Sequence, residues 1–123
     1  MSSKFFFDTY ALVEIGKGNP NYLKFRENVG MVLTKLNLLE YSYFLIREKR
    51  EKEIEEVFLH LSPFCVDYGD EVLVDAAKMK FHFVKEKLSF VDCIGYFLAK
   101  KHGVKFLTGD EKFKGKDNVE FVK

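Results

Sequence analysis

The sequence predicts an α/β fold in which a mostly parallel sheet is covered on both faces by helices. Short apolar segments of strand length alternate along the chain with longer segments of helical period, an order typical of a parallel sheet. The balance of 47% hydrophobic and 32% charged residues is that of an ordinary globular chain. A chain of 123 residues has room for one core, so we expect one domain over residues 1–123 with a five-stranded sheet.

The first part of the chain supplies two of these strands. Lys4 to Phe7 is a short apolar run, which predicts a buried strand. Thr9 to Ile15 has the length of a short helix, and the Gly- and Pro-containing segment 16–20 ends it. Two further elements follow, a short helix over Pro20–Asn28 with Asn19 as its cap and a strand over Met31–Leu33.

The middle of the chain changes to helical period. From about Leu36 the apolar residues recur at spacings of three and four, which predicts one apolar helix face made of Leu36, Leu39, Tyr43 and Ile46. The charge-rich segment Arg47–Glu56 is typical of a solvated helix face. Pro63 then precedes the third expected strand, Phe64–Val66.

Two helices and two strands complete the expected fold. A helix begins at Asp70 and runs to about Lys85, with a predicted buried face of Val74, Ala77, Phe81 and Val84. Ser89 is placed to cap the next helix, which runs to Lys101 and ends at Gly103. The last strands are Val104–Leu107 and Val119–Val122.

Composition excludes several classes of protein. The net charge of +1 provides no global basic field, so contact with nucleic acid has to be argued from local arrangement. No apolar run approaches the roughly 18 residues that a membrane span needs, so we expect no contact with a membrane. The apolar part of the N-terminal stretch is also shorter than the roughly 7–15 residues of a signal peptide, and we therefore expect a cytoplasmic protein.

Four carboxylates fall where an α/β sheet places its ligands, beyond the carboxyl ends of the strands. Asp8 follows the first strand directly, and Asp110 follows the Val104–Leu107 strand after two residues. Glu40 and Asp92 lie on helices that we expect at the same rim. Clustered acids repel one another unless a cation is bound, and oxygen ligands favour Mg²⁺ or Mn²⁺ over Zn²⁺.

Each of these acids also has a purely structural alternative. Asp8 and Asp110 could be helix N-caps, and Asp92 could complement a helix dipole. Glu40 could be an exposed position that the helical pattern misplaces. The occurrence of all four at one rim of one sheet favours the metal site over four unrelated structural roles.

The segments that carry these acids resemble the PIN-domain nuclease family. The matching segments are FFFDTYAL (residues 5–12), LNLLEYSY (36–43), LSFVDCIGYFLAKKHG (88–103) and VKFLTGDEKF (104–113), with VEFV near the end. The four motifs in this order span essentially the whole chain. The resemblance implies a three-layer α/β/α sandwich that binds Mg²⁺ or Mn²⁺ and hydrolyses phosphodiester bonds in RNA.

The resemblance also implies roles for single residues. Asp8, Glu40, Asp92 and Asp110 correspond to the acidic tetrad that binds metal and performs catalysis. Thr9 and Thr108 match the hydroxyl positions beside these acids. Many members carry another Asp or His two residues after the last acid, and this chain departs from that pattern with Lys112. Lys112 and Lys114 alternate past Asp110, either as part of a solvated loop or as contacts to the RNA backbone.

At the level of function, the resemblance implies a VapC-like toxin ribonuclease with an antitoxin partner, acting as a homodimer. The segment Leu36–Ile46 is our candidate for the dimer surface, because it carries little charge. The alternatives are a ribonuclease of ribosomal RNA processing or RNA decay, and a catalytically silent PIN-like binding module.

Two other α/β enzyme classes of similar size fit the sequence less well. A receiver domain needs adjacent acids after its first strand, and a haloacid-type phosphatase needs a second Asp two residues after the first. Here Thr9 and Tyr10 occupy those positions.

Overall fold

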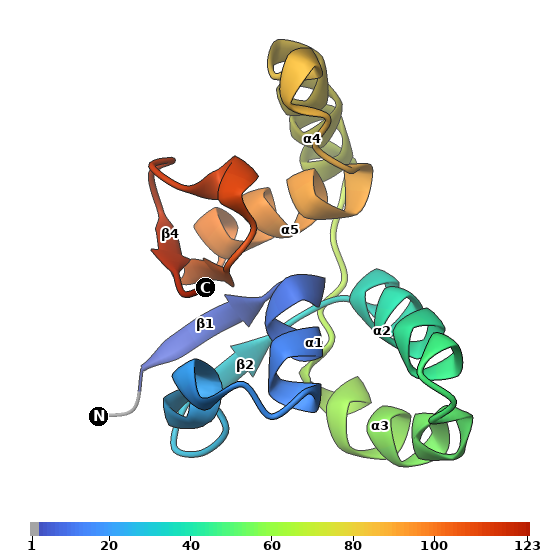
Figure 1. Cartoon of the computed structure of the whole chain (residues 1–123). Coiled ribbons are helices and arrows are strands. Elements are labelled where there is room, and N and C mark those ends of the chain that lie inside the picture. Colours follow the sequence, from blue (N-terminus) through green and yellow to red (C-terminus); the bar gives the residue numbers. More distant parts are fainter. Residues whose placement is uncertain (1–2) are drawn as a thin grey trace.

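The core of the computed structural model, which describes residues 3–123, is a sheet of four parallel strands. The strands lie in the order β2-β1-β3-β4, and Figure 1 shows the helices packed around them. In the register, Phe6 lies between Val32 and Phe106. The strand bounds are β1 Lys4–Phe7, β2 Gly30–Val32, β3 Lys105–Thr108 and β4 Val119–Phe121.

Five α-helices and five short 3₁₀ segments connect the strands. The α-helices are α1 Thr9–Gly16, α2 Lys35–Arg47, α3 Ile54–Leu61, α4 Asp70–His82 and α5 Phe90–Lys101. The 3₁₀ segments are η1 Pro20–Phe25, η2 Glu51–Glu53, η3 Ser62–Phe64, η4 Val84–Glu86 and η5 Glu111–Phe113. Residues 1 and 2, at the start of the N-terminal stretch considered for a signal peptide, lie outside the described chain.

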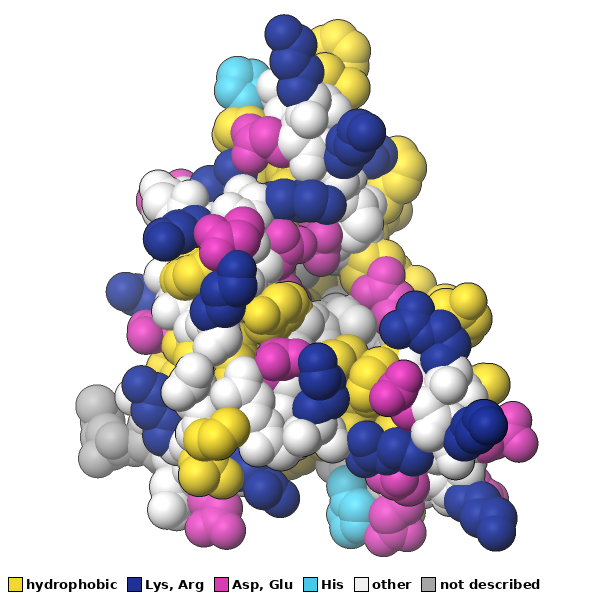
Figure 2. Space-filling model, viewed as in Figure 1, with side chains coloured by type: hydrophobic (Ala, Val, Ile, Leu, Met, Phe, Trp, Pro, Cys, Tyr) yellow, Lys and Arg dark blue, Asp and Glu magenta, His cyan; other side chains and the backbone are white. Residues whose placement is uncertain are grey.

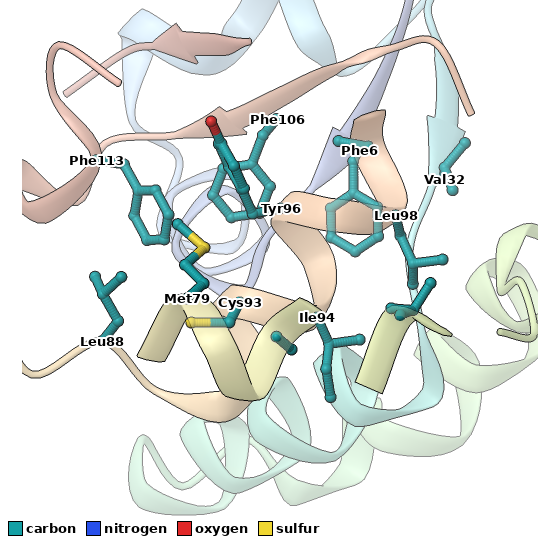
Figure 3. Close-up of a cluster of buried hydrophobic side chains, with 13 residues drawn as sticks. Phe6, Val32, Met79, Leu88, Cys93, Ile94, Tyr96, Leu98, Phe106 and Phe113 are labelled. Atoms are coloured by element: carbon teal, nitrogen blue, oxygen red, sulfur yellow. The ribbon is translucent and has the colours of Figure 1, made fainter. Parts of the chain in front are cut away.

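Alternate side chains of the central strands point to opposite faces of the sheet, and each face carries a hydrophobic cluster. Phe6 and Phe106 lie in one cluster with α4 and α5, as the close-up in Figure 3 shows. Phe7 and Leu107 lie in the other cluster with α1, α2 and η1. The expected α/β/α layering with a parallel sheet is therefore confirmed.

The prediction of a fifth strand at Phe64–Val66 is wrong. Pro63 lies in η3, which extends to Phe64, and only Cys65 pairs with the sheet, through an isolated parallel bridge to Leu33. This bridge consists of two backbone hydrogen bonds, from Leu33 N to Phe64 O at 3.3 Å and from Val66 N to Leu33 O at 2.9 Å, and η3 occupies the residues before it.

The predicted buried face of α4 is also wrong. The helix buries Val72, Ala76 and Met79, whereas Val74 and Phe81 are 51% and 81% exposed, and Ala77 is exposed as well. Because α4 ends at His82, short of the predicted end near Lys85, Val84 lies in η4, where it is 62% exposed. On α2 the predicted apolar face exists, but Leu39, Tyr43 and Ile46 point to solvent while Leu38, Tyr41 and Leu45 form the core contact. Both helices carry two apolar stripes, and spacing alone does not say which stripe meets the sheet.

The charged segment after α2 does not continue that helix. Lys49 adopts a left-handed conformation with φ of 59°, and the chain then turns through η2 into α3. Within residues 3–123, no helix combines the length and the apolar character that crossing a membrane requires.

Candidate active site

The site lies where the connectivity of the sheet changes direction. From β1 the chain crosses to β2 on one side, and β3 later pairs with the other side of β1. Such a switch point is where open α/β sheets bind ligands. Asp8 follows β1 there, its N–H donating to the Leu107 carbonyl oxygen at 3.3 Å, and Asp110 follows β3 two residues beyond its end.

Asp8 is the most buried of the four acids, with 2% of its surface exposed. Its side chain caps α1 by accepting a hydrogen bond from Ala11 N at 2.8 Å, as the structural alternative anticipated. Burial raises the pKa of Asp8 well above its ordinary value, against the lowering effect of bonds from Thr108 and Ala11. Repulsion by Asp92 and Asp110 raises this pKa further, so Asp8 faces other acids at the rim.

Asp92 stands in the first turn of α5, at the third position of a capping box. Its N–H donates to Ser89 Oγ at 3.0 Å, and its Oδ2 accepts from Ser89 N at 3.4 Å. Burial raises the pKa of Asp92, and repulsion by Asp110 and Glu40 adds to this effect. These mutual effects connect all four predicted acids electrostatically.

Asp110 is partly buried and is held by its own loop. Its Oδ1 accepts from Lys112 N at 3.0 Å, and its N–H donates to Thr108 Oγ1 at 3.1 Å. Gly109 makes this turn possible, because a Cβ there would lie 2.3 Å from both a ring carbon of Tyr10 and the Val122 carbonyl oxygen. The Thr108 hydroxyl thus accepts from the backbone of Asp110 and donates to the carboxylate of Asp8.

Glu40 reaches the rim from α2 and is held by Thr9. The Thr9 hydroxyl donates to Glu40 Oε1 at 2.5 Å and accepts from Asn37 Nδ2 at 3.2 Å. Asn37 is 1% exposed and was not a candidate in the sequence. The spacing of Thr34 and Asn37, a capping pair at the start of α2, is the signal that would have found it.

Oxygen atoms make up this donor set, which suits Mg²⁺ or Mn²⁺. Within residues 3–123, no three Asp, Glu, His or Cys side chains are arranged to enclose a metal ion by themselves. This arrangement fits Mg²⁺, which keeps several waters and takes one or two carboxylates rather than a full protein cage. Burial and repulsion raise the pKa values of Asp8 and Asp92 in the metal-free protein, and a bound dication would lower these pKa values.

The two lysines predicted to contact RNA lie exposed on the loop after Asp110. Lys112 Nζ donates to the Lys87 carbonyl oxygen at 3.2 Å, which links this loop to the segment before α5. Lys114 Nζ lies 5.6 Å from the centre of the Phe121 ring. Figure 2 shows basic and acidic side chains interspersed over the visible face, in keeping with the net charge of +1.

Comparison with known proteins agrees with this architecture. The family model of the PIN domain matches residues 5–119. Three solved structures are similar in fold, and the first is a chain of a toxin–antitoxin complex from Klebsiella pneumoniae, with a TM-score of 0.73, 18% sequence identity and 94% of each chain covered. The protein PAE2754 from Pyrobaculum aerophilum has a TM-score of 0.65 and 22% identity, with 98% of this chain and 92% of that chain covered. The sarcin–ricin-loop-cleaving toxin VapC20 from Mycobacterium tuberculosis has a TM-score of 0.74 and 18% identity, with 97% of this chain and 99% of that chain covered. None of the curated proteins matches the sequence significantly.

The family match covers nearly all of the strands and helices that position the four acids. It extends from β1 to the first residue of β4 and includes both strand ends at the switch point. The chain therefore belongs to the PIN domain family.

Proposed function

We propose that this protein is a Mg²⁺- or Mn²⁺-dependent endoribonuclease that hydrolyses phosphodiester bonds of RNA in the cytoplasm. The observation that carries the proposal is the placement of Asp8, which is 2% exposed, and Asp110 after two neighbouring strands at the switch point. Asp92 lies close enough to repel both, and Glu40 lies close enough to repel Asp92. Such acids lower the stability of the metal-free protein at neutral pH, and a metal-binding role explains why they are there.

Each acid has a proposed part in the chemistry. Asp8 and Asp110 would hold the metal directly, while Glu40 and Asp92 would bind it through water or orient the attacking water. When bound, the metal would lower the pKa of a water molecule and stabilise charge on the scissile phosphate. Lys112 and Lys114 would contact the RNA backbone.

Cleavage of a defined RNA in Mn²⁺ or Mg²⁺ tests this proposal. We expect cleavage with either metal, none in EDTA, and recovery when the metal is restored, because carboxylates alone cannot activate water sufficiently. Asp92→Asn is expected to lower the rate, since an amide holds and orients a water molecule less strongly than a carboxylate does. Cleavage that persists in EDTA would contradict the proposal, and a stable protein that cleaves no RNA with either metal would favour the silent binding module.

We further propose that the enzyme is the toxin of a toxin–antitoxin pair. Support comes from the fold shared with a chain of a toxin–antitoxin complex and with a toxin described as cleaving the sarcin–ricin loop. The exposed α2 face of Leu39, Tyr43 and Ile46 is our candidate surface for the antitoxin, because Glu40 lies next to it. A partner helix on this face could bring a Lys or Arg to the carboxylates.

Co-purification from the native host separates the toxin from its alternatives. We expect a small companion protein that inhibits cleavage, and we expect Tyr43→Asp to release it without loss of nuclease activity. Recovery of the free and fully active enzyme would instead favour a ribonuclease of ribosomal RNA processing or RNA decay.

We assign homodimerisation to α4 rather than to the segment Leu36–Ile46. Figure 1 shows α4 projecting from the rest of the molecule. The helix exposes Val74 and Phe81, and Val84 is exposed in η4 just after it. The first half of α4 contains the acids Asp70 and Asp75, and basic residues follow in and just after its second half, at Lys78, Lys80, His82 and Lys85. An antiparallel pair of α4 helices would place the acidic half of each opposite the basic half of its partner.

Light scattering tests the dimer. We expect a mass of twice 14.4 kDa for the wild type, and Phe81→Asp should reduce it to the monomer because it introduces a charge in the apolar face. Leu59→Asp, on the exposed side of α3, is the matched control and should leave the dimer intact. A monomeric wild type at micromolar concentration would overturn the assignment.

A further inference from the structure

A continuous hydrogen-bonded chain runs from the cap of α2 to Glu40. Thr34 N and Thr34 Oγ1 both donate to Asn37 Oδ1, at 3.0 and 2.8 Å. Asn37 Nδ2 donates to Thr9 Oγ1 at 3.2 Å, and Thr9 Oγ1 donates to Glu40 Oε1 at 2.5 Å. Asn37 and Thr34 are 1% and 2% exposed, so water does not compete for these groups.

The donor and acceptor chemistry gives this chain one direction. A backbone N–H can only donate, so the bond from Thr34 N requires the oxygen of the Asn37 amide to face the cap. The amide nitrogen is thereby turned to Thr9, and since it can only donate, the Thr9 oxygen accepts. The Thr9 hydroxyl has one proton, and it donates this proton in the hydrogen bond to the Glu40 carboxylate.

We propose that Asn37 is a positioning residue for the metal site, which acts on Glu40 through Thr9. The amide holds the Thr9 hydroxyl in the orientation that donates to Glu40, and this bond fixes the rotation of the carboxylate at the rim. The inference rests on the proposed function, in which Glu40 serves the metal. Asn37 itself touches neither metal nor substrate.

A comparison of the two capping boxes shows why an amide stands at this position. The box of α5 has an acid, Asp92, at its third position, and the acid also belongs to the site. The box of α2 needs only the oxygen of Asn37, which an Asp would supply equally well. The amide nitrogen is not required by the cap, and its bond to Thr9 is the feature that an Asp would lose.

A double-mutant cycle tests the relay through Mn²⁺ affinity, measured by calorimetry on the full chain. The variants are Asn37→Asp, which keeps the cap and removes the donor, Thr9→Val, which removes the hydroxyl, and the combination of both. We expect each single variant to weaken Mn²⁺ binding about tenfold, the order of effect for residues that orient a metal ligand through a hydrogen bond. The double variant should bind no more weakly than either single one, because both changes break the same relay.

The sign of the Asn37→Asp effect is informative, since an added negative charge beside the acids should by itself strengthen cation binding. Unchanged or tighter Mn²⁺ binding by this variant would therefore overturn the proposal, as would additive losses in the cycle. Thr9→Ser keeps the hydroxyl and should retain wild-type affinity. Asn21→Asp, the same chemical change at an exposed asparagine, should alter neither affinity nor activity.

A second measurement keeps failure of the relay distinct from failure of the proposed function. In metal-free protein, the side-chain amide protons of Asn37 should exchange slowly with solvent by NMR, and Thr9→Val should speed this exchange. If the wild type neither binds Mn²⁺ nor cleaves RNA, the nuclease proposal fails and this exchange still shows whether the relay exists. Fast exchange in the wild type would overturn the relay whatever the enzyme does.

Discussion

Asp8→Asn is expected to reduce RNA cleavage about a hundredfold or more, the order of effect that follows loss of one electrostatic group in an active site. The amide has nearly the size of the carboxylate and keeps one oxygen, but it is a poorer ligand for a hard dication. Asp8 is central in this respect, because it lies at the switch point and is influenced by both Asp92 and Asp110. Rates in Mn²⁺ at equal enzyme concentration measure the effect.

The same variant should keep or gain stability in EDTA. Asn is as good an N-cap as Asp, so the bond from Ala11 N can persist. The substitution also removes a buried charge whose pKa is raised by burial and by its acidic neighbours. We expect the melting temperature in EDTA to be equal to or above that of the wild type, and the rise on adding Mn²⁺ to be smaller.

A matched control for Asp8→Asn has to be an aspartate without a structural role at the rim. Asp117 is a poor choice, since it accepts hydrogen bonds from the Tyr96 hydroxyl and pairs with Lys100 at 3.1 Å. Asp75, exposed on α4, is the better control, and Asp75→Asn should cleave RNA at the wild-type rate. If Asp8→Asn also cleaves RNA at the wild-type rate, the tetrad is not the catalytic site.

The raised pKa values also determine how stability varies with pH. Between the ordinary carboxyl pKa and the raised pKa of Asp8 and Asp92, the folded protein binds more protons than the unfolded chain. The contribution of these groups to the free energy of unfolding therefore falls as the pH rises through that window. In EDTA, the advantage in melting temperature of Asp8→Asn over the wild type should grow as the pH rises above about 4, the ordinary carboxyl pKa.

The sequence predicts where the acids lie relative to the strands and helices, because the signals for these positions are local. Strand ends, caps and the residues that follow them are set by a few neighbouring residues, and the acids at Asp8 and Asp110 follow from the ends of two strands. The exposed stripe of α4 could not be predicted in the same way. Both Val72 and Val74 lie on apolar stripes at helical spacing, and only the tertiary position of α5 decides that Val72 is buried.

The relay behind Glu40 lay beyond sequence reasoning for a different reason. Thr9 and Asn37 are 28 positions apart, and their bond depends on the packing of α1 against α2. The spacing of Thr34 and Asn37 indicates a cap, but nothing local shows that the amide nitrogen faces Thr9. The prediction of a fifth strand is wrong for a similar reason. A strand over Phe64–Val66 needs a paired neighbour along its whole length, and the only bridge in this segment joins Cys65 to Leu33.

Phe106→Ala is expected to cost about 3–5 kcal/mol of the free energy of unfolding, a large part of the roughly 5–15 kcal/mol that such domains possess. Phe106 is fully buried, and its ring centre lies 4.9 Å from that of Phe113, 5.8 Å from Phe6 and 5.9 Å from Tyr96. The rings leave no space for repacking, since a Cβ on Gly95 would already lie 2.7 Å from the Phe6 ring. We expect the melting temperature to fall by about 10–20 °C.

Phe64→Ala is the matched control, because Phe64 is 47% exposed and loses much less contact. Phe106→Leu fills most of the space and should cost less than about 1.5 kcal/mol. A fall of only a few degrees for Phe106→Ala would show that this cluster does not hold α5 on the sheet. Because α5 carries Asp92 and β3 leads to Asp110, the folded fraction of Phe106→Ala should also bind Mn²⁺ more weakly than Phe106→Leu.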